Sequence, residues 1–279
     1  MTNKSAFTKI AASLLACLAI SAHALEEVPF ITSPDNVTRE MLRIANVGPQ
    51  DFVLDLGSGD GRIVITAAKL HGARGMGVEI DPTLVERSRA NAKLAGVESR
   101  AEFRDQDLFK TDLTQASVIT MYLLTEVNLA LRPALLELKP GTRLVSHDWD
   151  MGDWKPDQTT VLDVPDKKIG REKKSSVHQW VVPAKVQGLW CGAGAMRGVS
   201  MNMDQRYQEV KIKLRAMGRE RDYQGKITGS VATVPTSGGD TAMSFELQGD
   251  RLRIVAARES LAMLKDGVLT RAVGGACGA

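Results

Sequence analysis

An acidic residue followed by three closely spaced glycines is the feature of this sequence best suited to chemistry. The run is Val53-Leu54-Asp55-Leu56-Gly57-Ser58-Gly59-Asp60-Gly61-Arg62. Its apolar start predicts a short buried strand, and residues 63–70 after it predict a helix. Glycines in the connecting loop let backbone approach a nucleotide-like ligand, because glycine has no Cβ and accepts positive φ. We therefore expect a ligand at this loop.

The glycine spacing and the charge of Asp55 argue against a dinucleotide ligand. A dinucleotide fingerprint has Gly-x-Gly-x-x-Gly, with a helix N-terminus facing a pyrophosphate. Here Gly61 comes one residue early, and Arg62 stands where that fingerprint requires glycine. A carboxylate at Asp55 would repel a pyrophosphate, whereas it suits a ligand that carries an ammonium group and a sulfonium. An NAD-dependent oxidoreductase is therefore the disfavoured interpretation.

The combination of strand, acid, triple glycine and helix resembles the Asp/Glu-x-Gly-x-Gly-x-Gly signature of class I S-adenosylmethionine (SAM) methyltransferases. The longer run over residues 55–65, together with Pro29-Phe30-Ile31-Thr32, resembles the branch that contains the ATP synthase c-subunit lysine methyltransferase. The resemblance covers about residues 28–150. It implies SAM as cofactor and cofactor contacts at Thr32, Asp55, Gly57, Gly59, Glu79 and Asp107.

Strand-like and helix-like segments alternate along the first two thirds of the chain. This order predicts an α/β fold with a doubly wound, mostly parallel, Rossmann-like sheet of seven strands. Ser33 is expected to cap the first helix, with Pro34 in its first turn. The expected strands are residues 52–56, 75–80, 101–104, 117–123 and 142–146, with 159–164 and 177–182 closing the edge; later helices are expected at 63–70, 82–95 and 126–138.

The candidate cofactor residues follow the strand ends, because ligands of parallel sheets bind beyond the carboxyl ends of the strands. Glu79 ends the second strand, where a carboxylate can accept two hydrogen bonds from a ribose diol. Asp107 is expected to accept from an adenine amino group while Leu108 or Phe109 packs on the ring; Asp105 is the rival for that role. The full set of expected cofactor contacts is Thr32, Asp55, Gly57, Ser58, Gly59, Gly61, Glu79, Ile80, Asp107 and Leu108.

Three residues after the fourth and fifth strands are candidates for catalysis, namely Tyr122, His147 and Asp148. Methyl transfer from a sulfonium is an in-line displacement, so the protein mainly aligns the nucleophile and removes its proton. No metal is required. A neutral His147 could take a proton near pH 7; the alternative is a histidine that only makes structural hydrogen bonds. Trp149 and Trp154 either wall the acceptor pocket or only pack.

The sequence does not name the methyl acceptor. Met121-Tyr122-Leu123-Leu124 differs from the Asn-Pro-Pro-Tyr motif of amine methylation. A protein lysine and a small molecule both stay open. The alternative function is an exported protein that binds SAM or a related ligand without turnover.

The first 24 residues read as a cleavable signal peptide. Lys4 and Lys9 precede an apolar run over residues 10–20, and Ala22-His23-Ala24 provides an A-x-A cleavage site. We therefore expect a periplasmic or secreted protein without a transmembrane domain in its mature form; lipoprotein anchoring at Cys17 is the weaker alternative. Without the leader the chain has 34 basic and 33 acidic residues, a net charge of +1, so no nucleic-acid partner is expected.

The remaining chain divides into a methyltransferase domain over residues 25–183 and a small antiparallel β domain over residues 184–279. In the second part, Val210, Ile212 and Leu214 alternate with charged residues, which is strand periodicity. Residues 243–254 predict a hairpin that turns at Gly249-Asp250. A barrel or a sandwich is expected. Export makes Cys191 and Cys277 disulfide candidates; the alternative is two free thiols.

Overall fold

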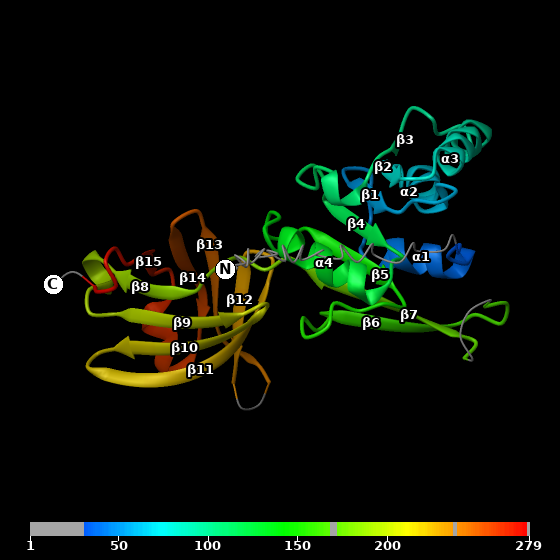
Figure 1. Ribbon diagram of the computed structural model, residues 1–279. Helices are drawn as coiled ribbons and strands as arrows, with labels where there is room; N and C mark the ends of the chain where they lie inside the picture. The colour runs from blue at the N-terminus through cyan, green and yellow to red at the C-terminus, as the bar shows by residue number, and fades with distance from the viewer. Residues whose placement is uncertain (1–30, 168–171, 237–238, 278–279) are drawn as a thin grey trace, which may run out of the picture.

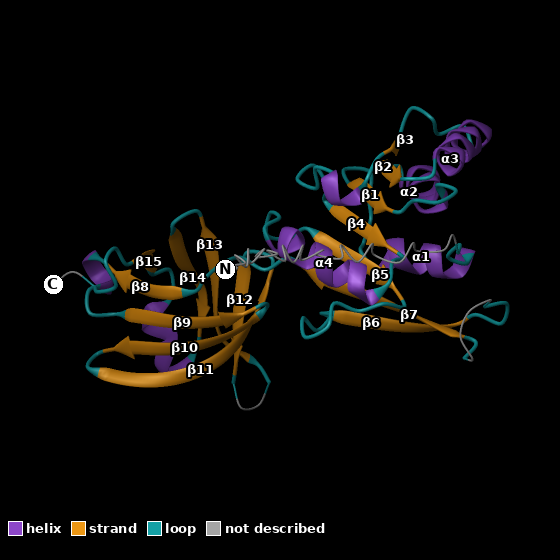
Figure 2. Ribbon diagram, in the orientation of Figure 1, coloured by secondary structure: helices purple, strands orange, loops and turns teal. Residues whose placement is uncertain are grey.

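The structure is a computed structural model that describes residues 31–167, 172–236 and 239–277. Figure 1 shows two units, a layered α/β part and a β-barrel, joined side by side. Figure 2 shows that the long helices all belong to the α/β part. The expected signal peptide, its cleavage site and Cys17 lie outside the described residues.

A seven-strand sheet forms the centre of the α/β part, as predicted. Its strands lie in the order β3-β2-β1-β4-β5-β7-β6. The first five are mutually parallel, whereas β7 runs antiparallel to both β5 and β6. The bounds are β1 (Phe52–Leu56), β2 (Arg74–Glu79), β3 (Ala101–Asp105), β4 (Val118–Met121), β5 (Arg143–His147), β6 (Gln158–Asp163) and β7 (Lys174–Val181).

Helices cover both faces of this sheet because alternate strand residues are apolar on both sides. Val53 packs in one cluster with α1 (Asp35–Ile44) and α2 (Arg62–His71), whereas Leu54 packs in another with α4 (Thr125–Leu136). The remaining helix, α3 (Pro82–Leu94), packs against α2, β2 and β3. The switch in strand order falls between β1 and β4, whose carboxyl ends face the same edge.

One helix start differs from the prediction. The N-cap residue of α1 is Pro34, and no side chain caps this helix. The Ser33 hydroxyl is instead 2.8 Å from Nδ1 of His147, which lies 114 residues later in the chain. A tertiary hydrogen bond has replaced the expected local one, and this attaches the segment before α1 to the end of β5.

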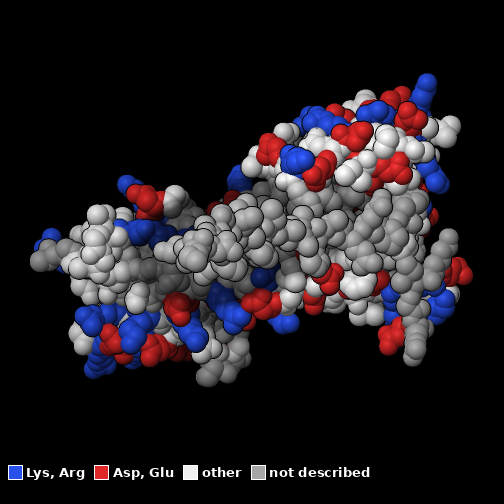
Figure 3. Space-filling view, viewed as in Figure 1, with Lys and Arg blue, Asp and Glu red and all other residues white. Residues whose placement is uncertain are grey.

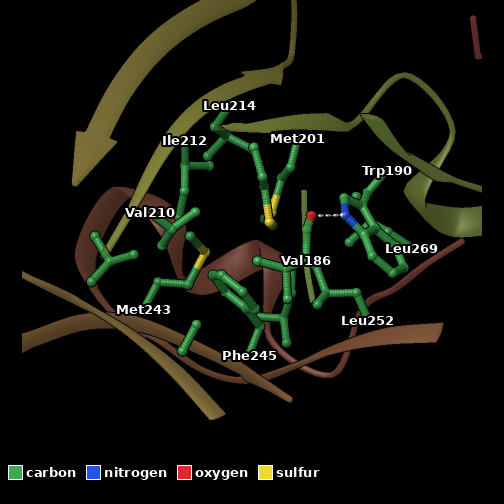
Figure 4. Close-up of a cluster of buried hydrophobic side chains, with 14 of the residues drawn as sticks. Val186, Trp190, Met201, Val210, Ile212, Leu214, Met243, Phe245, Leu252 and Leu269 are labelled. Carbon is green, nitrogen blue, oxygen red and sulfur yellow. Dashed lines mark hydrogen bonds between the residues drawn. The ribbon is translucent and has the colours of Figure 1, made fainter. Parts of the chain in front are cut away.

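The C-terminal part is a closed barrel and not a sandwich. Its strands lie in the order β10-β11-β12-β13-β14-β15-β8-β9. The interior is filled by apolar side chains such as Met201, Met243 and Phe245, and Trp190 donates to the carbonyl of Val186 (Figure 4). The bounds are β8 (Gly188–Gly192), β9 (Ser200–Arg206), β10 (Glu209–Ala216), β11 (Arg219–Thr228), β12 (Val231–Pro235), β13 (Thr241–Gln248), β14 (Arg251–Ala257) and β15 (Val268–Arg271).

The barrel closes where its first and last strands meet. Strands β8 and β15 pair antiparallel, with Cys191 opposite Thr270. A disulfide joins Cys191 to Cys277, whose Cα atoms are 5.5 Å apart. The expected pairing of the two cysteines is therefore confirmed, and it reinforces the closing seam of the barrel covalently.

The barrel attaches to the α/β part through the loop after β5 and the side of α4. Asp153 accepts hydrogen bonds from Arg132 of α4, from Arg206 of β9 and from Tyr207. The Tyr207 ring stacks on Trp154 with the ring centroids 5.8 Å apart. Trp154 is fully buried, so it packs between the two units and does not wall a pocket. Within the described ranges, no helix combines the length and apolarity needed to cross a membrane.

Candidate active site

A cavity of about 690 Å³ opens at the carboxyl ends of β1, β2 and β4. This is the place that the strand order predicts, because crossovers leave the β1–β4 boundary open to both sides. Every described residue that lines it lies between Ile31 and Val127. The barrel therefore contributes nothing to its wall in the described part of the chain.

The glycine loop forms one side of the cavity and is held tightly against β2. The backbone N–H groups of Gly57 and Ser58 both donate to the carbonyl of Val78, at 2.9 Å each. Gly57, Gly59 and Gly61 all have positive φ, which glycine adopts without strain. A Cβ on Gly61 would lie 2.6 Å from the Phe103 ring. The spacing that suggested close ligand approach thus also lets α2 pack beside β3.

Asp55 lies buried at the base of the cavity, 2% exposed. The Thr120 hydroxyl donates to its carboxylate at 2.7 Å. Burial, reinforced by the negative charges of Glu79 and Asp60, raises the pKa of Asp55 to about 7. A carboxylate held at this cost has a cation as its natural partner, because a nearby positive charge would favour the ionised form.

Glu79 points back into the glycine loop. One of its carboxylate oxygens accepts from the Gly59 N–H at 2.9 Å, and the other accepts from the N–H groups of Ile80 and Asp81. A carboxylate offers about four acceptor positions, so three backbone partners leave about one for a ligand hydroxyl. The expectation of two ribose hydrogen bonds therefore requires one backbone partner to move.

The residues expected around an adenine ring lie at the cavity wall. Asp107, Leu108, Phe109 and Ile80 all line it, whereas the rival Asp105 does not. Asp107 accepts from the Phe109 N–H at 2.9 Å and starts a short 3₁₀ turn over Leu108–Lys110. Ile80 is 66% exposed, an unusual exposure for a large apolar side chain that a flat ligand ring would cover.

Sequence reasoning missed an ion pair at the cavity. Arg62 contacts both carboxylate oxygens of Asp60, at 2.9 and 2.7 Å, and also donates to the backbone carbonyl of Ser33 at 2.8 Å. Asp60 is buried and its pKa is held below the usual range, against the effect of burial, by Arg62. The signal was present in Gly-Asp-Gly-Arg, where Arg62 was interpreted only as a departure from the dinucleotide fingerprint.

The structure separates the three catalytic candidates. Tyr122 lines the cavity. His147 and Asp148 do not: His147 is 1% exposed behind the Tyr122 ring, with ring centroids 3.9 Å apart. Both imidazole nitrogens have hydroxyl partners, Ser33 at 2.8 Å and Ser175 at 3.0 Å, and Asp148 is paired with Lys167 at 2.7 Å. The alternative of a structurally hydrogen-bonded histidine therefore matches the geometry.

The chemistry of the lining fits a cationic nucleoside. Acidic side chains dominate it (Asp55, Asp60, Glu79, Asp81 and Asp107), against Arg62, which is already paired. SAM carries a sulfonium and an ammonium group, and its adenine and ribose have the apolar and hydroxyl surfaces that Ile80, Leu108 and Glu79 can meet. A pyrophosphate in the same place would face uncompensated like charge.

Comparison with known proteins agrees with this geometry. A family model described as the ANTKMT methyltransferase domain matches residues 55–158. A protein-lysine N-methyltransferase of Saccharolobus islandicus is 45% identical over 138 residues, which are 49% of this chain and 86% of that protein. The chain belongs to this methyltransferase family. It is a SAM-dependent methyltransferase, and SAM is its cofactor.

Two further relatives show how far the likeness of this methyltransferase extends. The mouse lysine N-methyltransferase named for the c-subunit of ATP synthase is 36% identical, but the match covers only 48% of this chain and 53% of that protein. A crystal structure titled as an RNA methyltransferase from Salinibacter ruber, in complex with S-adenosylhomocysteine, is 50% identical with a TM-score of 0.52; it covers 56% of this chain and 96% of that one. The family model ends at residue 158, before the barrel begins.

Proposed function

We propose that this methyltransferase transfers the methyl group of SAM to the ε-amino group of a lysine in a protein. The observation that carries the proposal is the 45% identity with a protein-lysine N-methyltransferase that the chain covers almost completely. SAM supplies an activated methyl group on its sulfonium. The residues of this chain then need to admit a cationic side chain and align its amine in its neutral form.

The charge of the cavity supports a cationic acceptor. Five acidic residues among its described lining face one paired arginine, and residues 25–183 as a whole carry 24 acidic and 20 basic side chains, a net charge of −4. Such a field attracts a lysine-bearing segment and repels a phosphate backbone. The acidic lining is the reason to prefer a protein over RNA, although the Salinibacter structure is titled as an RNA methyltransferase.

Tyr122 is the candidate that meets the acceptor amine. Burial and the nearby charge of Asp148 raise its pKa to about 12, so its hydroxyl stays neutral at physiological pH. It can therefore orient an amine by hydrogen bonding but does not act as an anionic base. His147, which lies outside the cavity, is not assigned a role in proton removal.

A methyl-labelling experiment tests the acceptor. The purified enzyme is incubated with isotopically labelled SAM and, separately, with cell-envelope proteins and with total RNA. We expect label in protein, located on lysine by peptide mass spectrometry. Asp107→Asn should weaken labelling, whereas Asp105→Asn is the matched control because Asp105 ends β3 on the same sheet edge outside the cavity.

Two outcomes would contradict the lysine proposal. Label in RNA but not in protein would transfer the assignment to nucleic acid. Binding of SAM without formation of S-adenosylhomocysteine in either mixture would favour the alternative, an exported SAM-binding protein without turnover.

We also propose that the enzyme acts in the periplasm or outside the cell. The disulfide between Cys191 and Cys277 supports this, because disulfides persist in oxidising compartments, as does the signal-like composition of residues 1–24. Fractionation with N-terminal sequencing of the native protein tests it: cleavage after Ala24 is expected. A full-length cytoplasmic protein would contradict it, and a mature chain starting at a lipid-modified Cys17 would establish the anchored alternative.

A further inference from the structure

We propose that His147 is a positioning residue that holds the segment before α1 against the SAM cavity. The segment consists of Ile31, Thr32 and Ser33, which all line the cavity, and we call it the strap. The proposal rests on SAM as cofactor and not on lysine as acceptor. It gives a role to a buried histidine that does not line the cavity.

Two separate elements grip the strap at Ser33. The first grip is on the backbone: Arg62, at the start of α2, donates to the Ser33 carbonyl at 2.8 Å. Asp60 holds the guanidinium in place through two contacts at 2.9 and 2.7 Å. Because Arg62 follows the glycine loop directly, this grip ties the strap to the loop that lies across the cavity.

The second grip is on the side chain. The Ser33 hydroxyl is 2.8 Å from Nδ1 of His147, and Nε2 of His147 is 3.0 Å from the Ser175 hydroxyl on β7. Ser33, His147 and Ser175 are 3%, 1% and 2% exposed, so water does not compete for these bonds. Buried polar groups of this kind are costly to leave without a partner, and the chain therefore favours a single position of the strap.

The imidazole is neutral in this chain of hydrogen bonds. Burial lowers the pKa of His147 to about 4, and the positive charge of Lys167 acts in the same direction while Asp148 opposes it. A neutral imidazole has one donor and one acceptor nitrogen, which matches one serine hydroxyl on each side. Its ring also stacks on Tyr122 with centroids 3.9 Å apart, so the same side chain supports a second wall of the cavity.

The test compares two isosteric substitutions by calorimetric titration with SAM, which requires no acceptor. In His147→Asn the amide can occupy the position of Nδ1 and keep the bond to Ser33, whereas in His147→Gln it reaches the position of Nε2 and loses that bond. We expect SAM affinity close to wild type for H147N and about fivefold weaker for H147Q, the effect of one buried neutral hydrogen bond.

A double-mutant cycle shows whether His147 acts through the strap. Ser33→Ala removes the same bond from its other partner and avoids a large change in the core; it should weaken SAM binding about as much as H147Q. The S33A/H147Q double variant should then be no weaker than S33A alone, because both changes delete one interaction. Ser244→Ala, which removes a buried hydroxyl from the barrel, is the control and should bind SAM like the wild type.

Two results would overturn the proposal. One is SAM affinity unchanged in both S33A and H147Q. The other is a loss in H147Q that is as large in the S33A background as in the wild-type background, which would mean that His147 acts independently of Ser33. A soluble, folded S33A protein is sufficient to decide the first point if H147Q proves unstable.

Discussion

The α/β part and the barrel differ in what they bury. Among the described residues, the buried ionisable side chains Glu40, Asp55, Asp60 and His147 all belong to the α/β part. The buried polar residues of the barrel are Gln208 and Ser244, and its core is otherwise apolar. Both parts carry Lys, Arg, Asp and Glu on the surface seen in Figure 3, so the difference lies inside.

This difference separates work from support. Burying a charge costs free energy unless a partner compensates it, so a fold retains such groups where they serve a site or are locally paired. Asp55 and Asp60 line the cavity, and Glu40 is paired with Arg43 at 2.6 Å. The barrel has no such groups among its described residues, and its filled interior stabilises a scaffold. Ligand binding inside the barrel, which the sequence left open, has no support in this packing.

The largest expected effect is on barrel stability. Phe245 is 1% exposed at the centre of the barrel core, so Phe245→Ala should lower the free energy of unfolding by about 3–5 kcal/mol. The SAM affinity should stay within twofold of wild type, because Phe245 lies in the unit that lines no part of the cavity. Chemical denaturation and SAM titration measure the two quantities. Met263→Ala, at a 54% exposed site, is the control, and a loss of SAM affinity in Phe245→Ala would break the comparison.

The disulfide should have a comparable but smaller effect. It closes a loop with a sequence separation of 86, for which loop entropy implies about 4 kcal/mol, with engineered and native cases often lower. The Cys191→Ser/Cys277→Ser variant should therefore unfold at a lower temperature than the oxidised protein in calorimetry. Reductant should lower the melting temperature of the wild type and leave the variant unchanged. An effect of reductant on the variant would contradict the assignment.

Asp55→Asn should change SAM affinity and stability in opposite directions. Removing the charge that faces the cofactor should weaken SAM binding by about 2 kcal/mol, or roughly 30-fold. The raised pKa means that ionised Asp55 destabilises the folded protein near pH 7.5, so the ligand-free variant should melt at a higher temperature than wild type. Calorimetry with and without SAM measures both. Asp105→Asn serves as control, and a destabilised ligand-free Asp55→Asn protein would contradict the argument.

The pKa of Asp55 also predicts a pH dependence. The groups that face it are the Thr120 hydroxyl, Glu79 and Asp60, the last paired with Arg62. Below pH about 7 a proton occupies Asp55 and competes with a cationic ligand, so SAM affinity should fall by up to about tenfold per pH unit. S-adenosylhomocysteine, whose sulfur is uncharged, should show a weaker dependence. Equal pH profiles for the two ligands would argue against a charge contact at Asp55.

The same shift predicts how the ligand-free protein responds to pH. The folded pKa of Asp55 lies above the usual value of 3.8, so the folded state binds more protons than the unfolded state between these values. The contribution of Asp55 to stability is therefore favourable at low pH and is lost as pH rises toward 7. Melting temperatures of the wild type relative to Asp55→Asn across this range measure it.

The smallest expected effect lies at the contact between the two units. Arg206, Arg132 and Tyr207 donate to Asp153 and hold its pKa well below the usual range. Because these side chains are largely exposed, solvent screens the interaction. Asp153→Asn should lower the melting temperature by about 2 °C or less at neutral pH and leave SAM affinity unchanged. A large loss of SAM affinity would show that the barrel is coupled to the cavity.

Much of the α/β fold could be predicted because its signals are local. The strand before Gly57, the stop at Gly96 and the apolar alternation of β10 each follow from a few neighbouring residues, and all correspond to observed element ends or faces. The cofactor residues were predicted for the same reason, since they follow strand ends in order. Their presence at one cavity wall is observed, whereas their individual contacts with SAM stay predictions.

The parts that could not be predicted depend on distant residues. Ser33 was expected to cap α1, but its hydroxyl contacts His147, which is brought there by the pairing of β5 with the rest of the sheet. His147 and Asp148 were expected in the acceptor pocket because they end β5. The sheet instead places them behind Tyr122, and no local pattern records which side of a strand end faces a cavity.

By itself, the sequence determined the acid–glycine loop, the alternation of elements and hence the cofactor, because these depend on residue type and on spacing along the chain. Only the tertiary structure decided that the barrel closes, that Asp55 is buried enough for its pKa to rise, and that His147 serves Ser33. Closure, burial and hydrogen bonds between distant residues exist only after the chain has brought separate segments together and excluded water from between them.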